Sequence, residues 1–147
     1  MADEEKYFDR QQAEQLLPTI AVLLETAREQ KRSIETLDQE FSQVQNRILL
    51  MGGLVPPYPL LAQKRTERDA AMKKTREALA EIEKLGCLVK DLEIGLVDFP
   101  ARRDNETVYL CWKLGEERIG YWHGVEEGFA GRKPLDAGLA SGSGKPN

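Results

Sequence analysis

The apolar positions in the first third of the chain recur in alternating steps of four and three residues. This row predicts one long helix over residues 8–52, because a heptad spacing places its members on a single helical face. The apolar stripe must pack against a partner to be buried away from water. The row consists of Leu16, Ile20, Leu23, Ala27, Gln30, Ile34, Leu37, Phe41, Val44, Ile48 and Met51.

The ends of this helix carry ordinary helix signals, with one interruption between them. Asp9 can cap the first turn by accepting backbone N–H groups, and Gly52 suits the left-handed conformation that ends many helices. Pro18 lies inside the pattern and lacks a backbone donor. A kink at Pro18 and a late start near Leu17 both remain open.

A second helix is predicted over residues 60–86, after a proline-rich connector at 55–59. It is rich in alanine, lysine, arginine and glutamate, which are good helix formers. Lys64 and Arg68 interrupt its apolar row. The connector is short, so we expect the two helices to form a long antiparallel hairpin.

The texture changes after the second helix to short apolar and aromatic runs separated by turn residues, which indicates a β-meander over residues 87–123. We expect three antiparallel strands, the first over 92–99 (or from 88 with a bulge at Gly95) and ending at Pro100. The second covers 107–114. The third ends at 123 after a two-residue turn at Gly115-Glu116.

The predicted fold class is therefore α+β, mostly α: a long helical hairpin followed by a small three-stranded meander. Residues 124–135 are expected to form a loop or short helix, and residues 136–147 a flexible tail. Residues 1–135 are short enough to make one domain.

Charge and hydropathy argue against two classes of partner. The net charge is −4 and the pI about 5.2, which gives no general attraction to nucleic acid. No apolar run approaches the roughly 20 residues needed to span a bilayer. The polar start of the chain has no signal-peptide core, so we expect a reducing cytoplasm with Cys87 and Cys111 as free thiols.

A hairpin with a turn at Gly115-Glu116 fixes which residues share a face of the meander. Its register pairs Leu110 with Tyr121 and Val108 with His123, so Cys111 and His123 are predicted to lie on opposite faces. The chain also lacks CxxC, HExxH and ExxH spacings and has a single histidine. We therefore disfavour a Cys–His zinc site, which needs convergent ligands.

Asp98 is the most unusual carboxylate, because it lies in an otherwise apolar strand and needs a partner there. Arg102, Arg103, Arg132 and the Trp112 indole are the partners considered, and a buried Asp–Arg pair is favoured. His123 is expected to be a half-buried residue at a strand end, bonded to a backbone carbonyl.

Two chemical alternatives remain for this segment. If Asp98 and His123 converge, they can act as a general acid–base pair. A carboxylate-rich site of His123 with Asp98 and Glu116 can hold a divalent metal ion, with Glu126 or Glu127 as further ligands. We predict no other cofactor. The glycine-rich stretch ending at Arg132 can bind an anion.

The clustered short motifs of the second half are similar to those of an uncharacterised bacterial family, domain of unknown function 2203. The elements are Asp98-Phe99-Pro100, Leu110-Cys111-Trp112, Gly115-Glu116, Trp122-His123 and Gly128-Phe129-Ala130-Gly131-Arg132. The opening Tyr7-Phe8 and Leu16-Leu17-Pro18 also resemble that family. The resemblance implies small cytoplasmic proteins with a helical first half and carries no assigned reaction.

Two hypotheses follow. In the first, the protein is not an enzyme and associates with itself or with a protein partner through its helical hairpin. In the second, it is a small enzyme or a metal-dependent binding protein with a site around Asp98, Glu116, His123 and Arg132, beside Trp112. The second requires that these side chains converge in space.

Overall fold

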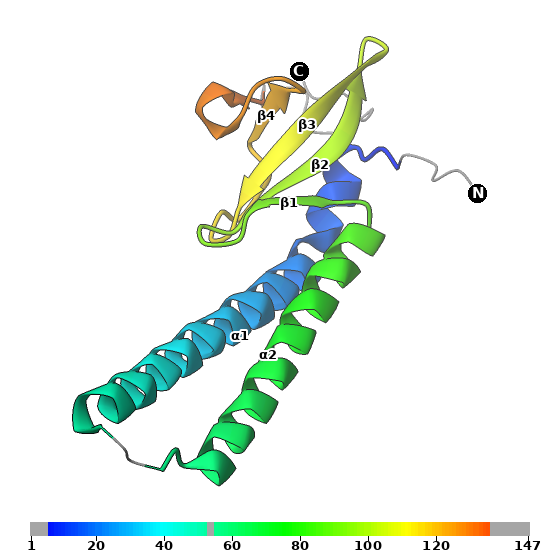
Figure 1. The fold of residues 1–147 in the computed structure, drawn as a ribbon. Coiled ribbons are helices and arrows are strands. Elements are labelled where there is room, and N and C mark those ends of the chain that lie inside the picture. The colour runs from blue at the N-terminus through cyan, green and yellow to red at the C-terminus, as the bar shows by residue number, and fades with distance from the viewer. Residues whose placement is uncertain (1–5, 53–54, 136–147) are drawn as a thin grey trace. The chain divides into compact units, whose positions relative to one another are not determined.

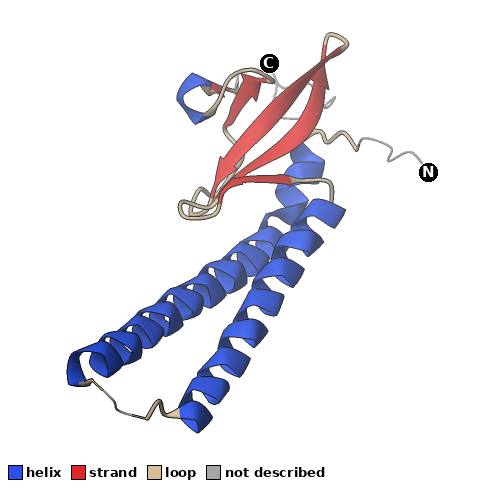
Figure 2. Ribbon diagram, in the orientation of Figure 1, coloured by secondary structure: helices blue, strands red, loops and turns tan. Residues whose placement is uncertain are grey.

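The computed structural model describes residues 6–52 and 55–135 and is α+β with most of its residues in helices (Figures 1 and 2). The elements are α1 (Arg10–Met51), α2 (Tyr58–Lys84), β1 (Leu88–Asp91), β2 (Leu96–Arg103), β3 (Glu106–Lys113), β4 (Tyr121–Gly124), the 3₁₀ turn η1 (Phe129–Gly131) and β5 (Lys133–Pro134). The strands form one antiparallel sheet in the order β1-β2-β3-β4-β5. The fold class is confirmed, but the prediction of three strands was wrong.

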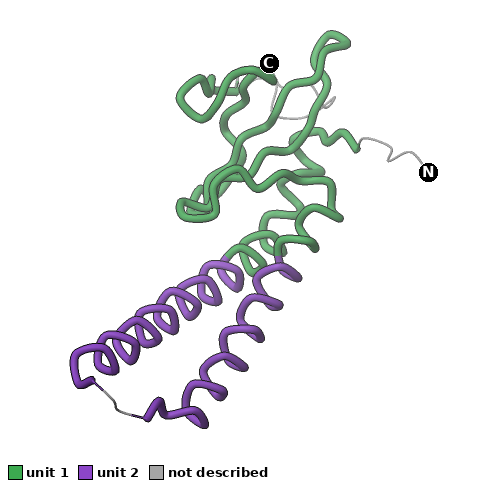
Figure 3. The backbone as a smooth tube through the Cα atoms, in the orientation of Figure 1, with its two compact units in different colours: residues 1–24, 79–147 green, residues 25–78 purple. Residues whose placement is uncertain are grey.

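Contacts divide the chain into two compact units (Figure 3). Unit 1 comprises Met1–Leu24 and Leu79–Asn147, and unit 2 comprises Glu25–Ala78. That residues 1–135 form a single domain stays a prediction. The expected tail, 136–147, lies outside the described residues. Among the described residues, neither helix has the length and hydropathy needed to cross a bilayer.

The start of α1 is fixed by a reciprocal cap. The Gln12 backbone N–H donates to Asp9 Oδ1 at 2.7 Å, and the Asp9 N–H donates to Gln12 Oε1 at 3.0 Å. Asp9 is thus the predicted cap. The helix begins at Arg10 and continues through Pro18, so Pro18 does not delay its start.

In unit 2 the two helices run antiparallel and are joined by ion pairs. Lys64 Nζ lies 2.5 Å from Glu40 Oε1, and Arg68 Nε lies 2.6 Å from Asp38 Oδ1. Lys64 and Arg68, which interrupt the apolar row of α2, therefore connect α2 to α1 through ion pairs. Among the described residues of this unit, only Leu37 and small alanines are buried.

The core of unit 1 lies between one face of the sheet and the first turns of α1. The sheet contributes Val97, Phe99, Ala101, Val108, Leu110 and Trp112, and α1 contributes Ala13, Leu17, Ile20 and Leu24. The buried row of α1 thus differs here from the predicted one, since Leu16 and Leu23 are only partly buried. At the helix entry, the ring of Phe8 meets Phe99 edge-on at 5.5 Å.

Strand β2 does not end at Pro100 as predicted but continues to Arg103, with Pro100 opposite Tyr109. The Phe8 N–H donates to the Pro100 carbonyl at 2.7 Å, so this backbone edge points away from β3. The pairing of β1 reaches only Asp98, so no ladder bond is lost where proline lacks its donor. The chain then reverses at Asp104-Asn105, both with positive φ, as a two-residue turn.

The connection between β3 and β4 is longer than the predicted turn at Gly115-Glu116, and this shifts the register by one residue. His123 pairs with Tyr109, and Cys111 pairs with Tyr121. The reason is a loop that buries Ile119, whose N–H donates to Glu14 Oε2 on α1 at 2.9 Å. The predicted faces of Tyr121, Trp122 and His123 were therefore wrong.

The two strands that sequence reasoning did not predict as separate elements are short. β1 is a separate four-residue strand with an irregular pairing to β2. β5 has two residues and lies in the segment predicted as loop or short helix, which also contains the 3₁₀ turn. Neither strand is long enough to show an alternation of apolar and polar residues.

We expect Gly95→Ala to lower the free energy of unfolding by about 2–3 kcal/mol. Gly95 has a φ of +74°, and an added Cβ would lie 2.5 Å from the Leu114 Cβ. Gly115→Ala is the control, because Gly115 also has positive φ (+106°) but open space around it. Urea denaturation of both variants separates the effect of the Leu114 clash from that of backbone strain. An equal loss of unfolding free energy in the two variants would contradict the clash.

Candidate functional site

Asp98 and Cys111 are brought together by the two-residue turn between β2 and β3. The turn makes Asp98 the cross-strand neighbour of Cys111. Side chains of paired residues project from the same face of a sheet. Both therefore lie on the face opposite the helical core, and both are fully buried, Asp98 with 1% of its surface exposed.

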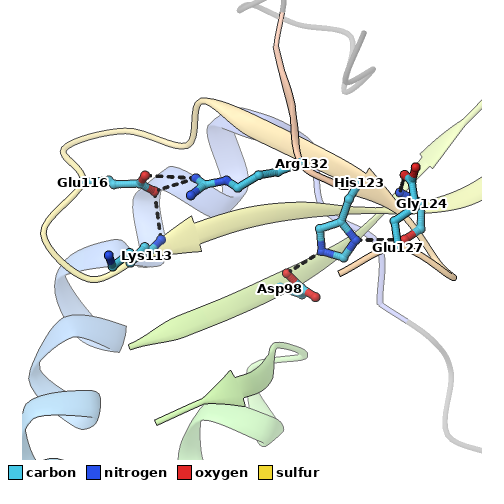
Figure 4. Close-up of polar contacts among 7 residues, drawn as sticks. All are labelled: Asp98, Lys113, Glu116, His123, Gly124, Glu127 and Arg132. Atoms are coloured by element: carbon cyan, nitrogen blue, oxygen red, sulfur yellow. Dashed lines mark hydrogen bonds and ion pairs between the residues drawn. The ribbon is translucent and has the colours of Figure 1, made fainter. Parts of the chain in front are cut away.

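His123 reaches the same face from β4, because it pairs with Tyr109 two residues before Cys111. Its Nε2 lies 3.0 Å from Asp98 Oδ1 (Figure 4), and only 3% of the residue is exposed. The prediction that Cys111 and His123 occupy opposite faces was wrong. The favoured Asp98–Arg pair was also wrong, since the partner of Asp98 is His123.

The other ring nitrogen of His123 is bonded to the backbone. His123 Nδ1 lies 2.8 Å from the Gly124 carbonyl oxygen, which can only accept, so Nδ1 carries a proton. Nε2 and Asp98 Oδ1 lie within hydrogen-bond distance of each other. The predicted backbone bond of His123 is present, although the residue is fully buried.

Cys111 completes the cluster. The ligand atoms of Asp98, Cys111 and His123 all lie within 4.8 Å of one another. Burial, reinforced by the neighbouring Asp98 carboxylate, raises the pKa of the Cys111 thiol to about 12. The unliganded thiol is therefore protonated at neutral pH.

The other predicted site residues form a separate arrangement in the loops beside the sheet. Glu116 accepts two bonds from Arg132 Nη2, at 3.0 and 2.9 Å, and one from the Lys113 N–H (Figure 4). Arg132 stacks on Tyr121 at 3.8 Å. Trp112 points into the helical core, and its Nε1 donates to the Glu116 carbonyl at 2.8 Å. These contacts clamp the loop after β3 and do not touch the Asp98–His123 pair.

A small cavity of about 130 Å³ leads to the cluster. Asp98 and His123 form part of its wall, and exposed residues at its rim open it to solvent. Glu127 fixes one side: its Oε1 accepts from the Gly124 N–H at 2.7 Å and from Lys133 Nζ at 2.6 Å. Lys133 lowers the pKa of Glu127 by this bond.

The geometry of the cluster and the protonation of Cys111 favour some chemical roles over others. A thiol nucleophile needs a thiolate, which the raised pKa of Cys111 disfavours, and His123 Nε2 faces the carboxylate. General acid–base work is also hindered, because both nitrogens of His123 already have partners. Metal coordination fits better. A metal-binding histidine commonly donates its other N–H to a backbone carbonyl, as Nδ1 of His123 does here.

Sequence reasoning named Asp98 and His123 but missed Cys111 as their neighbour, together with Lys90, Tyr109 and the cavity. A signal for Cys111 was present. A two-residue turn at Asp104-Asn105 by itself places Asp98 opposite Cys111. The position of His123 had no such signal, because it depends on how the loop around Ile119 packs on α1.

The comparisons with known proteins agree with the short motifs noted in the sequence. No curated protein and no solved structure matches the chain. The model of one family, described as an uncharacterized conserved protein, matches residues 6–135, which is most of the chain. The protein therefore belongs to the DUF2203 family.

Proposed function

We propose that this is a metal-dependent protein whose sheet binds one divalent transition-metal ion, best zinc, through Asp98, Cys111 and His123. The observation that carries the proposal is the convergence of a carboxylate, a thiol and an imidazole within 4.8 Å in a buried position.

The distances suit a small ion with little rearrangement. Bonds of zinc to oxygen, nitrogen and sulfur of about 2.0–2.3 Å place neighbouring ligand atoms of a tetrahedron roughly 3.3–3.6 Å apart. The 3.0 Å between Asp98 Oδ1 and His123 Nε2 is close to this value. Side-chain shifts of about 1 Å would bring Cys111 into the same shell.

Charge balance favours a divalent ion. With the ion bound, the ligands are one carboxylate, one thiolate and one neutral imidazole, so their charge cancels that of a divalent cation. No net charge then remains in the buried site. A mixed oxygen, nitrogen and sulfur ligand set suits zinc better than magnesium or calcium, which prefer oxygen alone.

The compartment that we propose is the cytoplasm. Both cysteines are free and buried in the described structure. A thiol ligand requires that Cys111 stays reduced, and the cytoplasm keeps thiols in that state.

The test of the proposed function is the metal content of protein purified without chelator, measured by elemental analysis beside native mass spectrometry. Zinc in proportion to protein, lost on replacement of the ligands, supports it.

A second candidate function is self-association through the hairpin. It is favoured by the apolar residues of unit 2 that are exposed to solvent. Leu49, Leu50 and Met51 at the end of α1 are 73%, 86% and 63% exposed. Phe41 and Val44 of the heptad row are only half-buried. Large apolar side chains left exposed in this number are typical of interaction sites.

The charges of unit 2 favour a second copy of the chain as the occupant. Residues 33–46 of α1 contain acidic residues but no lysine or arginine, whereas residues 64–76 of α2 are mostly basic among their charged positions. Two hairpins side by side, α1 of one against α2 of the other, would bring opposite charges together. They would also cover the half-buried apolar row.

We expect the protein to form a stable dimer at micromolar concentration and the double variant Val44→Glu with Ile48→Glu to be monomeric. Two charges in the apolar row cannot be buried without partners. Val22→Glu is the control, because Val22 is 63% exposed and lies outside the row. Sedimentation equilibrium gives the masses, and a monomeric parent protein would refute this candidate.

A further inference from the structure

The cavity beside the cluster suggests how the metal site is used, an inference that rests on the proposed metal binding. Three protein ligands leave the fourth position of a tetrahedral zinc ion open, which is the arrangement of catalytic and ligand-binding zinc rather than of structural zinc. The direction of that fourth position decides what reaches the ion.

The burial of the three ligands indicates this direction. Asp98 and His123 form part of the cavity wall, whereas Cys111 is fully buried and does not line the cavity. An ion held by all three would have the thiolate beneath it and the cavity on its remaining side. The fourth position therefore faces the cavity.

The size and charge of the cavity limit its ligand. Its volume of about 130 Å³ is well below the roughly 300–1,000 Å³ of sites for drug-sized molecules. Lys90 lies at its rim, with Nζ 5.4 Å from the ring centroid of Tyr109. Within the described residues, no acidic side chain forms an ion pair with Lys90. The acids of the wall are engaged, Glu127 by Lys133 and Asp98 by the cluster.

We infer that the site takes a small anion, a carboxylate or phosphate group, with one oxygen on the open position of the metal and the negative charge facing Lys90. The rings of Tyr109 and Phe129 line the space around it. A larger ligand could present such a group from its end, with the rest of the molecule outside the cavity.

The inference is tested with the full chain loaded with cobalt(II), whose visible spectrum reports the ligands and geometry of the ion. Acetate, inorganic phosphate and neutral imidazole are titrated separately. We expect acetate or phosphate to change the spectrum with saturation, and the anion that binds more tightly identifies the chemical class.

Lys90→Ala separates anion recognition from metal binding. We expect it to keep the cobalt spectrum, to leave imidazole binding unchanged and to weaken anion binding roughly threefold to fivefold. Lys84→Ala is the matched control, because it makes the same change in net charge at a residue that is 78% exposed and outside the cavity wall. It should leave all three affinities unchanged.

The failures are distinguishable. A chain that takes up no cobalt or zinc refutes the proposed function itself. A loaded chain whose spectrum ignores all three probes has no open position, which overturns the inference and leaves the metal site intact. Equal anion affinity in Lys90→Ala and the parent protein removes Lys90 as the group that selects the anion, which also overturns the inference.

Discussion

Protein purified without chelator is expected to carry about one equivalent of zinc. Cys111→Ser and His123→Gln are each expected to lower its affinity for zinc by at least about 100-fold, because the loss of a direct ligand should exceed the 10–100-fold effect of removing a supporting residue. The affinities are measured by competition with a chromophoric chelator, and circular dichroism checks that each variant is folded.

Cys87→Ser is the matched control for this experiment. Cys87 is also a buried free thiol, and burial raises its pKa to about 12 as it does for Cys111. It lies in the helical core of unit 1 and is not part of the cluster. We expect Cys87→Ser to bind zinc normally. Loss of zinc in this variant but not in Cys111→Ser would contradict the assignment of the ligand.

The pH dependence of zinc binding follows from the same thiol. Because the pKa of unliganded Cys111 is about 12, zinc must displace the thiol proton at any ordinary pH. Apparent affinity should therefore rise with pH, by about tenfold per unit for each proton released. An affinity independent of pH between 6 and 8 (about two units) would contradict a thiolate ligand.

The metal-free protein is expected to lose about 3–5 kcal/mol of its free energy of unfolding on Asp98→Ala. The substitution removes the group bonded to His123 Nε2 and leaves a buried imidazole nitrogen without a partner. Urea denaturation at neutral pH with chelator present gives the value. Other buried hydrogen-bonded pairs behave in this way when one member alone is removed.

Two variants make this test specific. Asp98→Asn should cost only about 1 kcal/mol, because its amide can donate to Nε2 of a neutral His123. Asp69→Ala makes the same truncation at an exposed position of α2 and should change stability by less than about 0.5 kcal/mol. If Asp98→Ala were as stable as Asp69→Ala, the pair would contribute nothing to the fold.

The helices of this protein were predictable because their signals are local. The cap at Asp9 and the end at Met51 depend on residues within one turn, and the structure places them within two residues of the predicted ends. The turn at Asp104-Asn105 is local in the same sense, because aspartate and asparagine tolerate the positive φ that they have here. The family was also recognisable, since its motifs are short runs of adjacent residues.

The strands after this turn were not predictable to the residue. Sequence reasoning took Gly115-Glu116 as the hairpin turn because glycine suits it. The chain instead continues to Tyr121 before pairing again, because Ile119 is buried and its N–H is bonded to Glu14. A partner more than a hundred residues away leaves no trace in the local pattern.

The sequence by itself determined the class of fold, the two helices, and the identity of Asp98 and His123 as residues that need partners. Only the tertiary structure decided that they are each other's partner, and that Cys111 joins them. The physical reason is that side chains alternate across a strand, so a shift of one residue moves each side chain to the other face of the sheet. That register is set by the packing of the loop around Ile119 on α1.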